Sequence, residues 1–223
     1  MVAVQIQQIR VPAGQRILLR DISWSDFERI LTELGENRAA RIAYRQETLE
    51  IMTPLPEHES AKENIGDLIK ALLEELEIEF LALGSTTFKD QRLGEGVEPG
   101  QCFYIAHESV VRGKDRLDLA VDPPPDSVLE IEVTSRTHPE IYRSLQVLEL
   151  WRFERGQLQI NLLQSGSYVQ ADASSLFPNL DVKTAIPQYA QRMKTVGRNQ
   201  TLKAFRQWVR DRLRDNQQDE QPG

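Results

Sequence analysis

Acidic side chains recur on two short alternating segments in the middle of the chain. In the first, Leu117–Val121, apolar residues alternate with polar ones, and Asp118 stands on the polar side. In the second, Leu129–Thr134, Glu130 and Glu132 share the polar side. Side chains on a β-strand point alternately to opposite faces, so both segments are predicted to be strands with one buried row. Acids on two neighbouring strands offer oxygen ligands to a divalent cation, so the pattern predicts a metal site at Asp118, Glu132 and Glu130.

The composition limits the class of protein. The chain has 223 residues, enough for a buried core, and a net charge of −7 with a pI near 5.2. This negative charge argues against a surface of positive potential, which nucleic-acid-binding proteins usually have. Between Gln191 and Asp215, however, eight basic residues outnumber two acidic ones. Such charge runs are more often a solvated helix face than a binding surface, although contact with nucleic acid stays open.

Cysteine content and hydropathy indicate the compartment. A single cysteine, Cys102, excludes an intramolecular disulfide framework and a cysteine-rich zinc site. The N-terminal residues lack the apolar core of a signal peptide, and no apolar run approaches membrane-spanning length. We therefore expect a soluble, cytoplasmic protein with no membrane partner.

Helices and strands are predicted to surround the acidic segments. The clearest helix follows a Pro54–Pro56 break, because apolar residues recur every three or four positions from Ile65 to Leu76. Further helices are predicted to begin at Ser25 and to cover Pro139–Val147, Thr184–Thr195 and Thr201–Leu213. The other predicted strands are Ala40–Tyr44, Thr48–Met52, Ile78–Leu83, Thr86–Lys89, Phe103–Ala106, Leu150–Phe153 and Leu158–Leu163. Residues 1–15 are predicted to be an N-terminal arm, 16–214 a single domain and 215–223 a polar tail.

Several longer motifs occur in a fixed order along the chain. They are LEIMTPLPEHE (Leu49–Glu59), GSTTF (Gly84–Phe88), GVEPGQCFYI (Gly96–Ile105), RLDLAVDPP (Arg116–Pro124), LEIEVTSRT (Leu129–Thr137) and LELW (Leu148–Trp151). By these motifs the chain resembles the Uma-two-type family of restriction endonucleases, within the PD-(D/E)xK nuclease superfamily. The resemblance covers about Ser23 to Arg210. It implies an α/β, restriction-endonuclease-like fold, in which a mixed sheet is flanked by helices, with a helical C-terminal extension.

The resemblance also implies roles for the acids. Asp118 is similar to the family's strand-end Asp, and Glu132 to the acid before its V-x-S. Glu130 is on the same predicted face as Glu132 and can share or replace its role. In the superfamily such acids bind Mg²⁺ or Mn²⁺, which activates water and stabilises charge on the phosphate. The literal dipeptide Pro125–Asp126 lies in a proline-rich turn and is interpreted as a turn former.

Further candidates come from the long helix. His58 matches a histidine that the family often has near the start of this helix. Glu59 and Glu63 are candidates for the helix acid of the superfamily, and His58 or Glu63 is expected to position water.

The sequence departs from the superfamily pattern at the lysine. An E-x-K motif has a lysine two residues after the acid, but Thr134 stands there after Glu132. In the wider family a lysine four residues before a tyrosine compensates. The matching tyrosine is Tyr142, and His138 stands four residues before it. Candidates for the cationic role are His138, Arg136 and Arg143, of which arginine is a poor proton acceptor because it is always charged.

Three functions remain open at this point. The first is an Mg²⁺-dependent endonuclease that hydrolyses phosphodiester bonds in DNA, expected to be a homodimer by the resemblance and because dimers are the commonest assembly. The second is a catalytically silent nuclease fold that binds a partner or dimerises, which the missing lysine favours. The third is a metal-dependent hydrolase of a small phosphoester.

Overall fold

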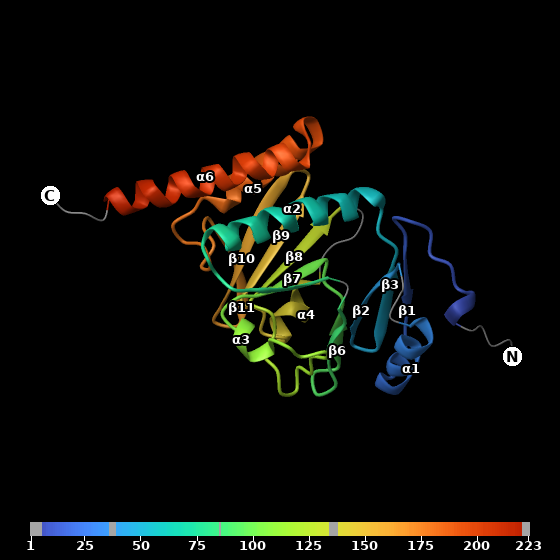
Figure 1. The fold of residues 1–223 in the computed structure, drawn as a ribbon. Coiled ribbons are helices and arrows are strands. Elements are labelled where there is room, and N and C mark those ends of the chain that lie inside the picture. Colours follow the sequence, from blue (N-terminus) through green and yellow to red (C-terminus); the bar gives the residue numbers. More distant parts are fainter. Residues whose placement is uncertain (1–5, 36–38, 85, 134–137, 220–223) are drawn as a thin grey trace, which may run out of the picture.

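The computed structural model describes residues 6–35, 39–84, 86–133 and 138–219, which form two β-sheets with helices around them (Figure 1). The first sheet is antiparallel and has five strands. In spatial order they are β1 (Arg16–Leu19), β3 (Thr48–Met52), β2 (Arg41–Arg45), β6 (Glu95–Val97) and β5 (Phe88–Asp90).

The second sheet has six strands and is mixed. In spatial order they are β11 (Ser167–Ala171), β10 (Gln157–Gln164), β9 (Glu149–Glu154), β8 (Ser127–Glu132), β7 (Gln101–Tyr104) and β4 (Leu81–Leu83). Strands β8 and β9 run parallel, with Leu129 opposite Trp151, and the other pairs are antiparallel. A mixed sheet flanked by helices confirms the predicted fold class.

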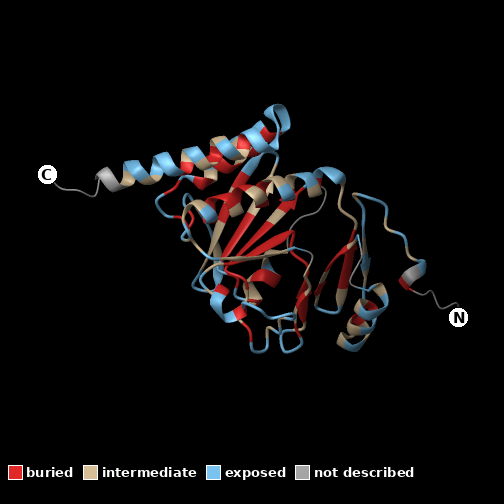
Figure 2. Ribbon diagram, viewed as in Figure 1, coloured by how far each residue is buried: buried red, intermediate tan, exposed pale blue. Residues whose placement is uncertain are grey.

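Helices pack against both sheets. They are η1 (Ile6–Gln8), α1 (Trp24–Leu34), α2 (Pro56–Glu75), α3 (Glu108–Val111), α4 (Pro139–Ser144), α5 (Val182–Val196) and α6 (Arg198–Asp219). Helices α2, α5 and α6 pack on one another, with α2 against β8 and α5 against β10. Helix α4 lies on the opposite face, beside β6 and β11. The strands between these layers are largely buried (Figure 2).

The alternation along β8 decides which way its acids point. Leu129 and Ile131 join the core under α2 and α5, while Val128 joins a second core with Tyr142 of α4. Because strand side chains alternate, Glu130 lies on the face of Val128, between the second sheet and the first. The burial of the apolar rows therefore fixes the position of this carboxylate.

The segment 117–121 is not a strand, so that prediction is wrong. Its backbone turns, because the N–H groups of Val121 and Asp122 donate to the Asp118 carbonyl oxygen at 2.9 and 2.7 Å. The Asp122 carboxylate accepts the Asp118 N–H at 2.8 Å and closes the turn. Local hydrogen bonds of this kind let aspartate favour turns over strand pairing.

Parts of the predicted arm and tail belong to the fold. Ile6 is buried and packs in a cluster with Phe27 and Ile30 of α1. Helix α6 continues to Asp219, past the predicted start of the tail at residue 215. Polar residues do not stop a helix that is already nucleated, because each added residue costs little. The single domain over residues 16–214 stays a prediction.

The basic residues of α6 pair with acids on α2. Arg206 and Arg210 both bind Glu75, at 3.1 and 2.6 Å, and Arg198 binds Asp67 at 2.6 Å. Exposed ion pairs of this kind contribute little to stability. They do neutralise three of the eight basic residues, which agrees with a packed and solvated helix face rather than an open basic surface. Within the described ranges, no helix has the length and apolar character to cross a membrane.

Candidate functional site

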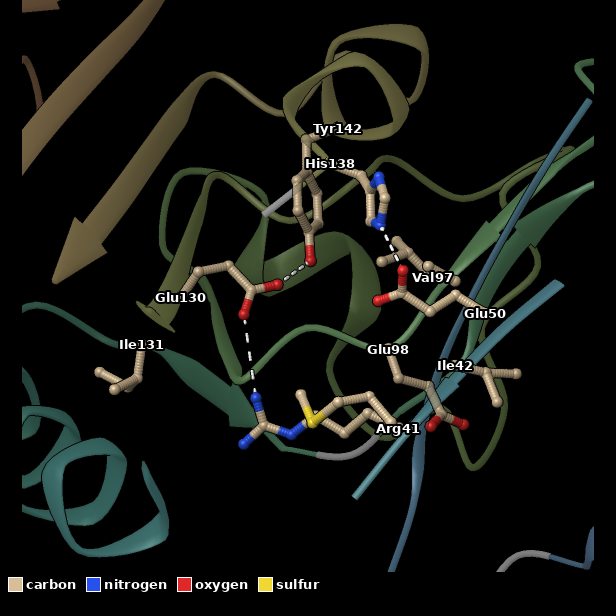
Figure 3. Close-up of a pocket in the computed structure, with 11 residues that line it drawn as sticks. Arg41, Ile42, Glu50, Val97, Glu98, Glu130, Ile131, His138 and Tyr142 are labelled. Carbon is tan, nitrogen blue, oxygen red and sulfur yellow. Dashed lines mark hydrogen bonds and ion pairs between the residues drawn. The ribbon is translucent and has the colours of Figure 1, made fainter. Parts of the chain in front are cut away.

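A pocket of about 50 Å³ lies between the two sheets, beside α4 (Figure 3). A cavity of that volume holds a few water molecules and is too small to enclose a nucleotide. The lining residues come from β2, β3, β6, β8 and α4 and from the segments next to them. They are Arg41, Ile42, Ala43, Glu50, Met52, Val97, Glu98, Glu130, Ile131, His138 and Tyr142.

Glu130 is one of three carboxylates that line this pocket, with Glu50 and Glu98, and its side chain is 14% exposed. The Tyr142 hydroxyl donates to Glu130 Oε1, and the Gly100 N–H also hydrogen-bonds this carboxylate. Burial raises the pKa of Glu130, although Arg41, Tyr142 and Gly100 oppose the shift. Burial and the Glu130 charge raise the pKa of Tyr142 well above its usual value, so its hydroxyl stays protonated and acts as a donor.

Arg41 connects Glu130 to an acid on α2. Its Nη1 lies 3.8 Å from Glu130 Oε2, and its Nη2 donates to Glu59 Oε1 at 2.7 Å. Lys62 donates to the other oxygen of Glu59. Burial raises the pKa of Glu59, but the hydrogen bonds and charges of Lys62 and Arg41 outweigh this effect and the pKa is lowered. Two buried cations therefore hold one helix carboxylate ionised.

Gly100 explains why Arg41 can approach this closely. A Cβ at position 100 would lie 2.7 Å from the Leu129 carbonyl oxygen and 3.2 Å from Arg41 Nη1. Contacts shorter than van der Waals distance are not tolerated in a packed interior, so a larger residue would displace the backbone or the guanidinium. The missing side chain at this position makes room for the arginine.

A second ion pair stands on the opposite side of the pocket. His138 Nε2 lies 3.4 Å from Glu50 Oε2, and Arg16 donates to the same oxygen at 3.1 Å. The Glu50 carboxylate raises the pKa of His138. Burial raises the pKa of Glu50, but His138 and Arg16 outweigh it and the net shift is downward. The structure thus places His138 in the same pocket as Glu130.

Glu132 is committed to an ion pair outside the pocket lining. Arg152 on β9 donates Nε to Oε1 at 2.7 Å and Nη2 to Oε2 at 2.8 Å. The pair joins neighbouring parallel strands, and the Glu132 side chain is only 6% exposed. This bidentate arrangement is the strongest form of an arginine–carboxylate contact.

Asp118 lies apart from the pocket lining. It is exposed, and its Oδ1 accepts the Ala120 N–H at 2.9 Å within the turn described above. The strand that was expected to carry it next to Glu130 does not exist, because Asp118 and Asp122 fold the segment into a turn. The structure therefore brings Glu130 and His138 together but leaves out Asp118.

The remaining predicted site residues are not among the described residues that line the pocket. His58, in the first turn of α2, is fully buried, and within the described part of the chain neither ring nitrogen has a hydrogen-bond partner. Burial, together with the Arg41 charge, lowers the pKa of His58, so the ring is neutral at pH 7. Glu63 is largely exposed and lies 3.4 Å from Lys62. Arg136 lies outside the described residues.

The donor set does not fit a divalent metal as it is folded. Across the described ranges, no three His, Cys, Asp or Glu side chains are grouped so that they could hold a metal ion. Glu132 is bound by Arg152, Glu130 by Tyr142 and Gly100, and Asp118 caps a turn. Mg²⁺ needs several oxygen ligands with free lone pairs in nearly octahedral geometry. The predicted ligands would have to rearrange before they could form such a site.

Three residues of this region were not predicted from the sequence. Arg41 and Glu50 lie on the hairpin of β2 and β3, and only the packing of one sheet against the other brings them to Glu130. The sequence pattern could have indicated Lys62, because its spacing places it in the row of α2 that continues to Ile65 and Ile69. In the structure Lys62 is only 8% exposed. A lysine in a buried row needs an ionic partner, which Glu59 supplies.

Comparisons with known proteins agree with this fold. A family model named Uma2, described as "Putative restriction endonuclease", matches residues 24–194. The chain belongs to the Uma2 family. Among solved structures, it is similar to one titled as a putative nuclease belonging to DUF820 from Anabaena variabilis. That comparison has a TM-score of 0.53 and 14% sequence identity, and it covers 76% of this chain and 98% of the other. A search of curated proteins finds no match.

Membership of the Uma2 family confirms the resemblance read from the motifs. The matched range includes β2, α2, β8, α4 and β9, and therefore every described residue of the Glu130 pocket. At 14% identity the solved structure shows the shared fold and no more. The family gives this chain a nuclease-like fold, and the chemistry has to be argued from its own side chains.

Proposed function

We propose that this protein hydrolyses phosphodiester bonds in DNA at the pocket beside Glu130. One observation carries the proposal: in this Uma2-family chain the strand carboxylate of Glu130 lies next to the buried cation Arg41. A second buried cation, Lys62, binds the same Glu59 carboxylate as Arg41. A guanidinium is well suited to a phosphate group, because it can donate two parallel hydrogen bonds to two of the phosphate oxygens.

The pocket residues suggest how the chain itself would contribute. Glu130, whose pKa is raised by burial, can accept or hold a proton closer to neutral pH than an exposed glutamate. The protonated hydroxyl of Tyr142 orients this carboxylate. His138, made more basic by Glu50, adds positive charge on the other side of the pocket and would offset phosphate charge.

Mg²⁺ or Mn²⁺ is the cofactor that the family's chemistry implies, and it would activate the attacking water when bound. The folded donor set offers no ready site, so metal dependence is a property to be measured rather than a step to be assigned. The roles of Asp118, Glu132, His58, Glu63 and Arg136 also stay predictions of the sequence, as does the homodimer.

Plasmid nicking tests the proposal. Supercoiled DNA is incubated with wild type and Glu130→Gln in Mg²⁺, in Mn²⁺ and in EDTA. The matched control is Glu154→Gln on β9, an equal change of a half-exposed glutamate outside the pocket lining. We expect nicking by wild type and by the control, and a loss of about a hundredfold or more in Glu130→Gln.

Two results would contradict the proposal. Equal nicking by Glu130→Gln and wild type would indicate a contaminating nuclease or a different centre, and Asp118→Asn in the same assay would test the site predicted from sequence. No cleavage by wild type under any condition would favour a second candidate, a catalytically silent nuclease fold. A specific observation supports that candidate, because both oxygens of Glu59 already have basic partners and Glu130 is bound by Tyr142 and Arg41.

A further inference from the structure

The guanidinium of Arg41 lies between acids from two different elements. Glu59 comes from the first turn of α2, and Glu130 from β8. Arg41 is 2.7 Å from Glu59 Oε1 and 3.8 Å from Glu130 Oε2, and its side chain is only 10% exposed. A single internal cation thus bridges the helix carboxylate and the strand carboxylate (Figure 3 shows the contact with Glu130).

All four oxygens of the two carboxylates have partners. In Glu59, Oε1 accepts from Arg41 and Oε2 accepts from Lys62. In Glu130, Oε1 accepts from Tyr142 and Oε2 faces Arg41. A divalent cation would compete with a charge that is permanent, since arginine stays protonated at every pH at which proteins fold. It would also meet the repulsion of two buried positive side chains.

We propose that Arg41 occupies the cation position between Glu59 and Glu130, so that a divalent metal binds these two acids only after the guanidinium has been displaced or removed. Gly100 supports this assignment, since its lack of a side chain leaves the space that the guanidinium uses. The inference goes beyond the proposed function, because it concerns how the two acids are neutralised and holds whether or not DNA is cleaved.

Metal binding to an arginine variant tests the inference. Arg41→Met keeps an unbranched side chain of similar length in a pocket that already contains Met52, and it removes the charge. Mn²⁺ binding is followed by electron paramagnetic resonance of free Mn²⁺ and by the shift in melting temperature. We expect weak binding by wild type and at least about tenfold tighter binding by Arg41→Met. The double variant Arg41→Met/Glu130→Gln should return to the wild-type affinity.

Arg45→Met is the matched control. Arg45 lies on the same strand and pairs with Glu95 at 3.0 Å, outside the pocket lining, so its removal should leave Mn²⁺ affinity unchanged. Equal affinity of wild type and Arg41→Met would overturn the inference. If Arg41→Met does not fold, Mn²⁺ binding to wild type and to Glu130→Gln still tests the inference. Tight Mn²⁺ binding by wild type that is lost in Glu130→Gln would overturn the inference. None of these results depends on nicking, so failure of the proposed cleavage is distinguishable from failure of this inference.

Discussion

Replacing Glu132 by glutamine should destabilise the protein whether or not a divalent metal is present. The sequence assigns this residue to a metal site, whereas in the structure Arg152 binds both of its oxygens, at 2.7 and 2.8 Å. The two assignments predict different responses to metal. An ion pair contributes its stability in EDTA, while a metal ligand contributes only when the ion is bound.

The size of the effect follows from the burial of the two partners. Hydrogen bonds to charged groups contribute about 1.5–3 kcal/mol each, and breaking a fully buried pair costs about 3–5 kcal/mol. Glu132 is 6% exposed but Arg152 is 26% exposed, so the arginine can turn partly to water when its partner is lost. We therefore expect about 2 kcal/mol for Glu132→Gln. Arg152→Met should cost more, about 3 kcal/mol, because it leaves a buried carboxylate unpaired.

Urea denaturation of wild type, both single variants and the double variant gives the assay. A loss of about 2 kcal/mol lowers the urea midpoint by about 1 M if the slope is near 2 kcal/mol/M. The double variant should cost less than the sum of the single variants, with a coupling of about 1.5–2 kcal/mol. Glu154→Gln, on a half-exposed side chain of β9, should change stability by less than about 0.5 kcal/mol.

A particular outcome would refute this reasoning. If Glu132→Gln leaves the midpoint unchanged in EDTA and lowers it only in Mg²⁺, then Glu132 is a metal ligand and the Arg152 contact is unimportant. Additive costs in the double variant would likewise show that the two side chains do not interact.

Two other perturbations follow from buried or paired acids. Glu149 is fully buried and accepts from Trp151 Nε1 at 2.7 Å and from the Ser175 N–H at 2.6 Å. In Glu149→Gln the side-chain amide N–H₂ faces one of these donors. The free energy of unfolding in urea should therefore fall by about 2–4 kcal/mol, with a change in tryptophan emission. An unchanged urea midpoint would contradict this network. The raised pKa of His138 means that its ion pair with Glu50 contributes fully below the unfolded value of 6.5 and is lost as the pH rises through the folded value. The lowered pKa of Glu50 means that its share is present above 4.5 and lost as the pH falls. The difference in melting temperature between wild type and His138→Asn should therefore be largest between pH 4.5 and 6.5. The ion pair should contribute less than about 1 kcal/mol, because His138 is 39% exposed. A difference in melting temperature that does not vary with pH would argue against the pair.

The sequence predicted a strand at β8 from its alternation, and the structure has a strand at Ser127–Glu132. In β8, Leu129 and Ile131 enter one core while Glu130 faces the other side, as the pattern indicates. The segment 117–121 has the same alternation and is a turn, because Asp122 bonds the Asp118 N–H. Periodicity over five residues cannot distinguish these cases, since it contains no information on whether a partner strand is present.

Local signals also shifted the start of one helix. The pattern from Ser25 to Glu28 predicts a capping box, but Ser23 is the cap and accepts the Asp26 N–H at 3.2 Å. Both serines are good capping residues, and the choice depends on where the chain enters the core. Helix α1 ends at Leu34, with Gly35 as its C-cap.

The candidate site could be predicted only in part, because its members come from distant segments. Motif spacing leads to Glu130, His138 and Tyr142, which are close in sequence and lie together in the pocket. Arg41 and Glu50 reach it through the packing of the first sheet against the second, a contact that no local pattern encodes. The sequence thus indicates the acid but not the cation beside it.

This difference explains why the fold and the chemistry have to be judged separately. The second sheet and α2 supply Glu130 and Glu59, which are the kinds of acid that a nuclease of this superfamily needs. The hairpin of β2 and β3 supplies Arg41, which neutralises both acids from within the chain. A cation that belongs to the protein gives the pocket its stability without a metal, but it cannot lower the pKa of a bound water as Mg²⁺ does. The inference on Arg41 predicts that a divalent metal reaches these acids only when the guanidinium leaves them, so metal binding to Arg41→Met should be measured before any search for a preferred DNA sequence.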